Sequence, residues 1–250
     1  MIIKKPIVED LLLQAIYEHI EEEAAKEPRR PYIGASSIGD DCELKLWMYY
    51  KYPHLARKTK AELKLAAMDG HRCEDFMAAN FRKIPGIEVI THDENGKQFG
   101  FSDLGGAYKG HWDGLITGIP QAPKTTHTWE HKAKNEAFYE KLLKIKEKFD
   151  EKEVLKEWDY LYYCQAVTYM HYSDTTRHYM TVSTSGLRKI QSIRTDCNPK
   201  LAILLREKAE RISRYPSPPT GISTNPSFWR CKDFCDFKDN CPSINKNKKL

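Results

Sequence analysis

The chain has 250 residues, of which 40% are hydrophobic, 30% charged and 11% aromatic. This composition excludes a disordered chain, and no apolar run approaches the roughly 20 residues of a membrane-spanning helix, so no membrane partner is expected. The net charge of +5 permits a polyanionic partner without requiring one. Seven cysteines without a visible secretion signal are expected to be reduced thiols or metal ligands in a cytoplasmic protein.

Three helices are predicted in the first third of the chain. The first has apolar residues at helical spacing and ends before Pro28. The second follows a linker, and Ser36 or Ser37 is expected to cap it. Six Lys and Arg residues against one Glu fill the segment 45–64, which is either a DNA-contacting surface or ordinary solvated surface. The three helices are expected over residues 7–27, 37–51 and 61–82.

Short strands and longer helices are predicted after Pro85. Segments rich in Val, Ile, Thr, Tyr and Trp, separated by Gly, Asn and Pro, are typical of strands. The strands are expected over residues 87–92, 97–101, 107–117, 126–133, 177–184 and 188–194, and the helices over 136–149, 153–172 and 198–213. This order predicts an α/β domain whose sheet is covered by helices. The expected units are an N-terminal helix (1–30), a main domain (31–215) and a Cys-rich C-terminal segment with a basic tail (216–250).

Two carboxylates and a lysine are predicted to meet on neighbouring strands. Asp113 lies in the sequence GHWDG on one strand, and Glu130 and Lys132 lie on the next. Strand side chains alternate between the two faces of a sheet, so Glu130 and Lys132 share a face. His131 points to the opposite face, and only its backbone carbonyl could join the site.

This arrangement suits the hydrolysis of phosphodiesters. Carboxylate oxygens bind Mg²⁺ or Mn²⁺, which polarises the phosphate and lowers the pKa of a bound water. A nearby lysine can orient that water and offset the developing negative charge. The same E-x-K pattern also occurs at residues 43–45 and 62–64, in predicted helices. The strand context and Asp113 therefore distinguish residues 130–132.

The order of four short motifs resembles the RecB-like branch of the PD-(D/E)XK nucleases. A G-x-x-x-(H/E) helix is matched at Gly70 and Glu74, the G-H-x-D-G and E-x-K strands follow it, and a Q-x-x-x-Y helix is matched at Gln165 and Tyr169. The resemblance implies a restriction-endonuclease-like fold with a mixed central sheet flanked by helices. It also implies that Glu74, rather than His71, is a third metal ligand. Gln165 and Tyr169 would contact the DNA backbone or the scissile phosphate, although ordinary helix packing also explains such a pair.

A cysteine cluster near the C-terminus forms a second motif. Cys231, Cys235 and Cys241 supply three thiols on a short segment, and Cys42 is the candidate for a fourth. The segments around them resemble the iron–sulfur nucleases of the same branch, which include AddB-type subunits and CRISPR-associated RecB-like exonucleases. The resemblance implies a [4Fe–4S] cluster that joins the N-terminal helical region and the C-terminal tail as a clasp. Four thiolates would also bind zinc, and the three-residue first gap and Glu43 after Cys42 depart from the usual pattern.

These features together predict a metal-dependent deoxyribonuclease, exonucleolytic on single-stranded DNA or free DNA ends. A helicase, a recombination protein or a CRISPR-adaptation protein would suit it as a partner. Two alternatives stay open. One is a non-catalytic nucleic-acid-binding protein with a structural metal clasp, and the other is an endonuclease of the same fold.

Overall fold

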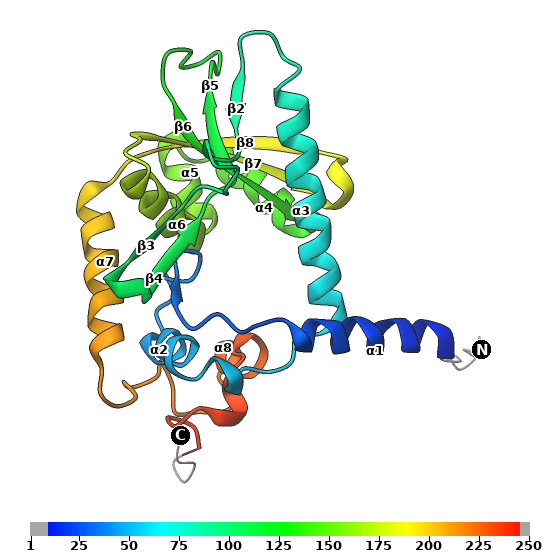
Figure 1. Ribbon diagram of the computed structural model, residues 1–250, viewed down its shortest axis with the longest axis vertical. Coiled ribbons are helices and arrows are strands. Elements are labelled where there is room, and N and C mark those ends of the chain that lie inside the picture. The colour runs from blue at the N-terminus through cyan, green and yellow to red at the C-terminus, as the bar shows by residue number, and fades with distance from the viewer. Residues whose placement is uncertain (1–9, 246–250) are drawn as a thin grey trace.

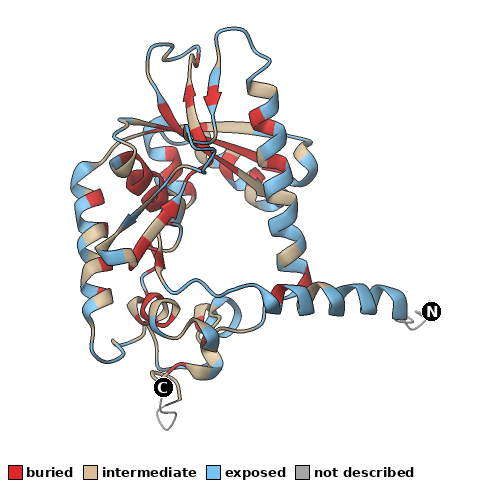
Figure 2. Ribbon diagram, viewed as in Figure 1, coloured by how far each residue is buried: buried red, intermediate tan, exposed pale blue. Residues whose placement is uncertain are grey.

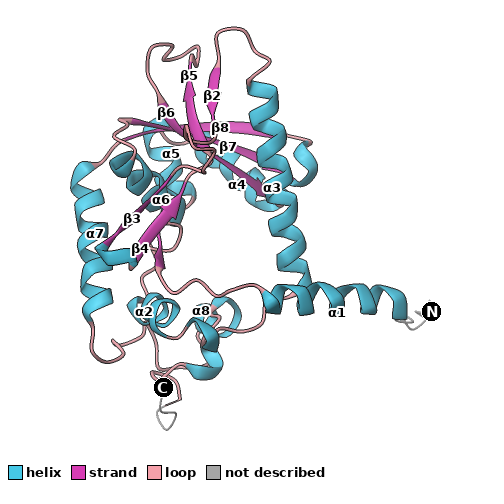
Figure 3. Cartoon of the chain, in the orientation of Figure 1, coloured by secondary structure: helices cyan, strands magenta, loops and turns pink. Residues whose placement is uncertain are grey.

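The structure is a computed structural model that describes residues 10–245. Its strands form two sheets rather than the single central sheet that the sequence predicts (Figure 3). The larger sheet has the order β2 (Glu88–Ile90), β5 (Gly114–Thr117), β6 (His127–Lys134), β7 (Arg177–Thr184) and β8 (Ile190–Asp196). The smaller sheet has the order β1 (Ile33–Gly34), β4 (Tyr108–His111) and β3 (Gly100–Asp103). The large sheet is mixed, as predicted, because β6 and β7 are parallel and its other pairs are antiparallel.

Helices cover both faces of the large sheet. α3 packs on one face, where Phe81 meets Trp129 edge to face with ring centroids 5.7 Å apart. α4, α5 and α6 cover the other face, and α7 lies on the far side of the molecule from α3 (Figure 1). The helices are α1 (Leu11–Lys26), α2 (Glu43–Lys51), α3 (Ala61–Phe81), α4 (Glu136–Lys146), α5 (Glu151–Trp158), α6 (Tyr160–Tyr172), α7 (Pro199–Arg214) and α8 (Trp229–Phe234).

The predicted strand over 107–117 is wrong in one respect, because it is two strands in different sheets. β4 pairs with β1 and β3, whereas β5 pairs with β2 and β6. The chain crosses between the sheets at Trp112 and Asp113. Gly114 permits the crossing, since a Cβ atom there would lie 2.6 Å from the backbone oxygen of Ile90. Asp113 therefore lies at a junction and not within a strand.

Two predicted helices also need correction. The helix predicted over 37–51 begins only at Glu43, with Cys42 at its N-cap, while the Ser37 hydroxyl bonds to the Gly34 carbonyl in a preceding turn. The helix predicted over 153–172 is broken at Asp159, which is extended and whose side chain accepts from the backbone N–H of Tyr162. That carboxylate satisfies a free N–H at the start of α6, which is the usual reason for Asp at an N-cap.

Three apolar clusters form the core, and Figure 2 shows the buried residues gathered around the sheets. One lies between the large sheet and α4–α6, and a second lies under α3. The largest joins α2, the small sheet, α6, α7 and the C-terminal segment. It brings Trp47 and Phe237 into one core, so the C-terminal segment packs against the region near residue 45. No helix within residues 10–245 is long and apolar enough to cross a membrane.

Candidate active site

The strand junction brings Asp113 beside the middle of β6. The register pairs Gly114 with Trp129, which places the preceding residue next to Glu130 and His131. The Oδ2 atom of Asp113 accepts a hydrogen bond of 2.7 Å from the backbone N–H of His131. Both carboxylates are buried, with residue exposures of 8% for Asp113 and 3% for Glu130. Because the chain changes sheet at this point, the carboxylate of Asp113 lies against β6, the strand that carries Glu130.

Lys132 and His131 point in opposite directions from β6, as the alternation of strand side chains predicts. The Nζ atom of Lys132 donates to Oε1 of Glu130 at 2.5 Å. The His131 ring instead lies 3.0 Å from Oγ1 of Thr181 and 3.2 Å from Oγ of Ser183, on the face that α3 covers. Burial lowers the pKa of His131 to about 4, so its ring is neutral. The His131 side chain therefore packs between β6 and β7 on the face opposite Glu130 and Lys132.

Glu74 reaches the same site from α3. Its pKa is raised to about 7, mainly by burial and also by the nearby carboxylate of Asp113, while Lys132 opposes the rise. His71 lies one turn earlier, with its Nδ1 atom 3.7 Å from Oε2 of Glu74 and its side chain 82% exposed. The half-buried Glu74, rather than the exposed His71, is thus the α3 side chain that faces the buried carboxylates.

Three ionised carboxylates at this site would carry more negative charge than one lysine can balance. Burial and the proximity of Asp113 raise the pKa of Glu130 to about 8, despite the contact with Lys132. Burial also raises the pKa of Asp113. Burial alone would lower the pKa of Lys132, but Glu130 and Asp113 outweigh it and keep this pKa above its usual range. The lysine therefore stays charged while the carboxylates repel one another.

Gln165 and Tyr169 lie on α6, which packs beside the carboxylates of the site. The Nε2 atom of Gln165 donates to Oε1 of Glu130 at 3.1 Å and to the Tyr169 hydroxyl at 2.9 Å. Tyr169 fits because residue 110 is glycine, whose Cβ would otherwise lie 2.7 Å from the tyrosine ring. The sequence pattern suggested contacts to DNA, and it did not indicate that Gln165 binds Glu130 directly.

Two buried oxygens in this site have no hydrogen-bond partner among the described residues. They are Oε2 of Glu130 and Oε1 of Gln165. A buried polar atom normally finds a partner, since leaving it unpaired costs about 1–3 kcal/mol. Carboxylate and amide oxygens are hard ligands, so this donor set fits a Mg²⁺ or Mn²⁺ ion. In the part of the chain that the structure describes, however, no three His, Cys, Asp or Glu side chains already form a metal-binding arrangement.

The cysteines of the expected clasp lie near one another where the C-terminal segment meets α2, although no three of them form a metal-binding group within residues 10–245. Burial raises the pKa of Cys231, and the neighbouring Cys241 and Cys42 raise it further. Burial raises the pKa of Cys235 to about 11, with smaller effects from Cys42 and Cys241. Backbone contacts hold the two segments together, because the N–H of Arg57 donates to the carbonyl of Asp236 at 2.8 Å.

A buried carboxylate that sequence reasoning missed ties the two halves of this cluster together. Asp40 accepts from the backbone N–H of Cys42 at 2.9 Å, from Lys45 at 3.0 Å and from Arg230 at 3.0 Å. Arg230 directly precedes Cys231, so one side chain orients both cysteine-bearing segments. No local signal in the sequence could have joined residues 190 positions apart.

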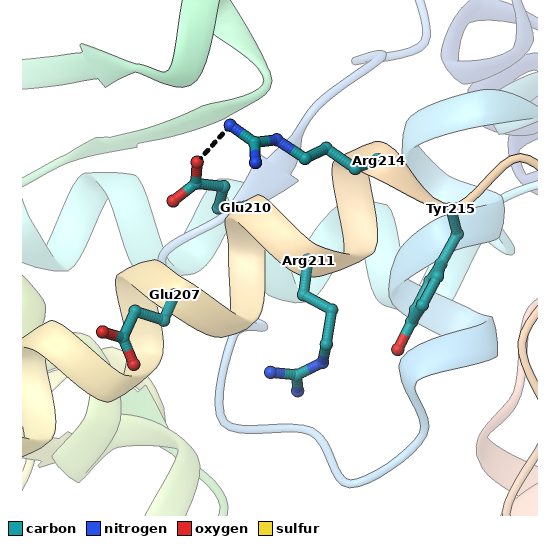
Figure 4. A pocket seen from close by; sticks show the side chains of 5 residues that line it. All are labelled: Glu207, Glu210, Arg211, Arg214 and Tyr215. Carbon is teal, nitrogen blue, oxygen red and sulfur yellow. Dashed lines mark ion pairs between the residues drawn. The ribbon is translucent and has the colours of Figure 1, made fainter.

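Other features fit structural roles. Cys73 and Cys164 are buried, and Cys197 is partly buried, as expected of small packing residues. In the basic segment 45–64, Lys45 and Arg57 are paired with carboxylates, which reduces the charge available for DNA. A surface hollow on α7 is lined by charged residues, and its Arg214 is paired with Glu210 at 2.5 Å (Figure 4). It is lined by Glu207, Glu210, Arg211, Arg214 and Tyr215, none of which belongs to the carboxylate site.

No family model matches the sequence, and no curated protein matches it. Among solved structures, an alkaline exonuclease (LHK-Exo) from Laribacter hongkongensis has a similar fold, with a TM-score of 0.50 and 13% identity over 78% of this chain and 90% of that one. Its complex with dAMP gives a TM-score of 0.49 at 14% identity, over 77% and 90% of the two chains. SSO0001 gives 0.48 at 14% identity, over 94% and 97%. The chain thus has a mixed α/β fold similar to that of a nuclease.

Proposed function

We propose that the chain is a metal-dependent DNA nuclease, and that it acts as an exonuclease on single-stranded DNA or free DNA ends. The observation that carries this proposal is the unpartnered Oε2 atom of Glu130, buried beside Asp113, Glu74 and Lys132. Buried carboxylates that raise one another's pKa are stabilised by a cation, and a charged lysine among them suits a reaction that builds negative charge. The likeness in fold to an alkaline exonuclease supports the same reading.

Each residue has a distinct role in this proposal. The residues that would hold Mg²⁺ or Mn²⁺ are Asp113, Glu130 and Glu74, together with the backbone carbonyl of His131. The bound ion would polarise the phosphate and lower the pKa of a water molecule. Lys132 keeps its proton because of the adjacent carboxylates, so it can orient the attacking water and offset the charge on the phosphate.

Gln165 has a positioning role as well as a proposed contact to DNA. Its amide N–H holds Oε1 of Glu130, which leaves Oε2 free for the ion. Its own Oε1 atom is buried without a partner among the described residues, and its Nε2 atom also donates to the Tyr169 hydroxyl. We propose that these two side chains also contact the scissile phosphate once DNA is bound.

Digestion of labelled DNA tests the proposed function. End-labelled linear DNA and covalently closed circular DNA are incubated with Mg²⁺ or Mn²⁺ and with either the wild-type chain or the Asp113→Ala variant. Release of mononucleotides from linear DNA alone supports the exonuclease. Cutting of the circle indicates the endonuclease. DNA binding without cleavage by the metal-loaded wild type indicates the non-catalytic binding protein.

We also propose that Cys42, Cys231, Cys235 and Cys241 hold a [4Fe–4S] cluster, with zinc as the alternative ion. The gathering of these four thiols between α2 and the C-terminal segment supports it. Thiolates are soft ligands, so the cluster site differs in kind from the carboxylate site. A cross-link between residues 42 and 231 closes a very long loop, which stabilises a fold by on the order of 4–5 kcal/mol in the chain-entropy model.

A further inference from the structure

Lys134 and Tyr162 form a cationic group at the edge of the carboxylate site. Glu130, Lys132 and Lys134 are spaced two residues apart on β6, so all three lie on the face covered by α6. The Nζ atom of Lys134 donates to the hydroxyl of Tyr162. The Tyr162 ring lies near both lysines, with its centroid 4.6 Å from Nζ of Lys134 and 5.4 Å from Nζ of Lys132.

Among the residues that the structure describes, no carboxylate balances the charge of Lys134. Within residues 10–245, Lys132 is paired with Glu130, whereas Lys134 forms no ion pair. Its ammonium group is held instead by the rings of Tyr162 and Phe138, the latter centroid lying 5.4 Å away. Aromatic faces attract a cation without neutralising it. The half-buried ammonium therefore keeps a net positive charge and still has N–H groups to donate.

The spacing of these groups matches a chain of phosphates. Alternate residues of a strand lie about 7 Å apart, so Lys132 and Lys134 present two ammonium groups in a row along β6. On the opposite wall, Tyr162 lies almost one helical turn before Gln165 on α6. The strand and the helix thus place Lys134 and Tyr162 as a second polar pair beside Glu130 and Gln165. Consecutive phosphates of one nucleic-acid strand would meet these pairs in turn.

We propose that Lys134 and Tyr162 bind a second phosphate group of the DNA, adjacent to the phosphate that is cleaved. The inference rests on the proposed nuclease function and extends its binding site by one nucleotide. Lys134 supplies the charge, and the Tyr162 hydroxyl orients the ammonium and donates to the same phosphate. The bound group is either the neighbouring phosphodiester or a phosphate at the end of the strand.

The salt dependence of DNA binding tests this subsite without relying on cleavage. Fluorescence anisotropy of a labelled single-stranded oligonucleotide in EDTA gives the binding constant of the full-length protein over a range of salt concentrations. Loss of one phosphate contact lowers the slope of log K against log salt by about 0.7 for a single strand. We expect Lys134→Met to lower the slope by that amount, because methionine keeps the packing against both rings but removes the charge.

Two matched variants separate binding from packing. Lys144→Met removes an exposed lysine on α4 outside the site, and it should leave the slope unchanged. Tyr162→Phe keeps the ring and loses the hydroxyl, so it should weaken binding severalfold with little change in slope. A Lys134→Met protein that melts at a lower temperature but keeps the wild-type slope would show that the lysine only packs, and would overturn the proposal.

Modified oligonucleotides identify the phosphate that is bound. One carries a single neutral methylphosphonate linkage next to the terminal linkage, and another lacks the phosphate at its end. The slope difference between wild type and Lys134→Met should vanish for one of the two. Its persistence with both would contradict the subsite. If Lys134→Met changes the salt-dependence slope as expected but the wild-type protein never cuts DNA, the nuclease function alone is rejected. If the protein cuts DNA but Lys134→Met leaves the slope unchanged, the subsite alone is rejected.

Discussion

Lys132 and Glu130 are two residues apart on β6 and share a hydrogen bond of 2.5 Å, yet this pair does not neutralise its surroundings. Burial is the main reason that the pKa of Glu130 is raised to about 8, and the nearby carboxylates of Asp113 and Glu74 add to it despite the contact with Lys132. One lysine is not enough to keep three neighbouring carboxylates ionised, so their raised pKa values favour a divalent cation among them. The same lysine remains charged at neutral pH and can act on a phosphate.

Replacement of Lys132 by alanine should abolish most cleavage and largely preserve the fold. Removal of a positioned charge from a site of this kind typically lowers the rate by about 10²–10³-fold. Glu130 can take up a proton when its partner is lost, because its pKa is already raised, so unfolding is not forced. Nuclease assays and melting temperatures measure the two effects. The exposed Lys148→Ala serves as the control, and near wild-type cleavage by Lys132→Ala would remove the lysine from the mechanism.

Protein purified without oxygen should be brown, with the broad visible absorbance of an iron–sulfur cluster. Cys42→Ser should bleach this colour, although Cys42 is far in sequence from the other three cysteines. Cys73→Ser, Cys164→Ser and Cys197→Ser should leave it unchanged, since these residues lie outside the cluster of four thiols. Absorbance and elemental analysis measure the outcome. A colourless protein with stoichiometric zinc would assign the clasp to zinc instead.

The clasp and the carboxylate site should respond to different treatments. EDTA should stop cleavage at once but leave the colour and the melting temperature nearly unchanged, because hard and soft ligands hold different ions. Cys235→Ser should lower the free energy of unfolding, by on the order of 4 kcal/mol, before it affects the activity of the folded fraction. A Cys235→Ser protein with an unchanged melting temperature and no cleavage would show that the cluster acts on DNA and not on stability.

His178 should make the protein less stable in mild acid. Burial is the main reason that its pKa falls to about 3, and the charges of Lys132 and His127 add to it. Its unfolded pKa is about 6.5, so its contribution is complete above pH 6.5 and is lost as the pH falls toward 3. Between pH 6.5 and 5 the free energy of unfolding should drop by about 1–2 kcal/mol.

Urea unfolding at several pH values measures this effect. His178→Gln should flatten the decrease between pH 6.5 and 5, while His171→Gln, at an exposed position on α6, should follow the wild type. An unchanged pH profile for His178→Gln would mean that another group titrates.

Two glycine substitutions should have opposite effects on stability. A Cβ at Gly110 would lie 2.7 Å from both Ala35 and Tyr169, so Gly110→Ala should cost about 1–3 kcal/mol and displace Tyr169 from Gln165. Gly70 lies within α3 with nothing within 4 Å of the Cβ position. Gly70→Ala should therefore stabilise the protein by about 0.5–1 kcal/mol. Thermal unfolding of both variants measures these changes in stability. Equal changes in the two variants would contradict the tight packing of Gly110 against Tyr169.

The sequence allowed the mixed α/β class and most elements to be predicted, because apolar periodicity reports burial directly. It did not reveal the break at Asp113. Trp112 is a buried aromatic residue of the kind common in strands, so the residue types at the junction do not mark the end of one strand and the start of the next. The helix break at Asp159 was missed because helical periodicity continues on both sides. An Asp within such a run was the available signal, since it is a common N-cap.

The candidate site also has some features that the sequence predicts and others that it does not. The shared face of Glu130 and Lys132 follows from strand geometry, and the structure confirms it. The contact of Gln165 with Glu130, and the link that Asp40 makes between Cys42 and Arg230, depend on how distant elements pack. Local pattern carries no information on such pairs, so only the folded chain could reveal them.

The core that unites Trp47 with Phe237 cannot form until the ribosome has synthesised the chain as far as Phe237. At about 5–20 residues per second, a ribosome needs roughly 10–40 s to extend the chain from Cys42 to Cys241. During that time the apolar surface of α2 has no C-terminal segment to cover it. Truncated products would keep that surface exposed, and chaperones and proteases recognise such surfaces. The apolar core around α2 is therefore complete only after the segment that contains Phe237 has been synthesised and has folded back.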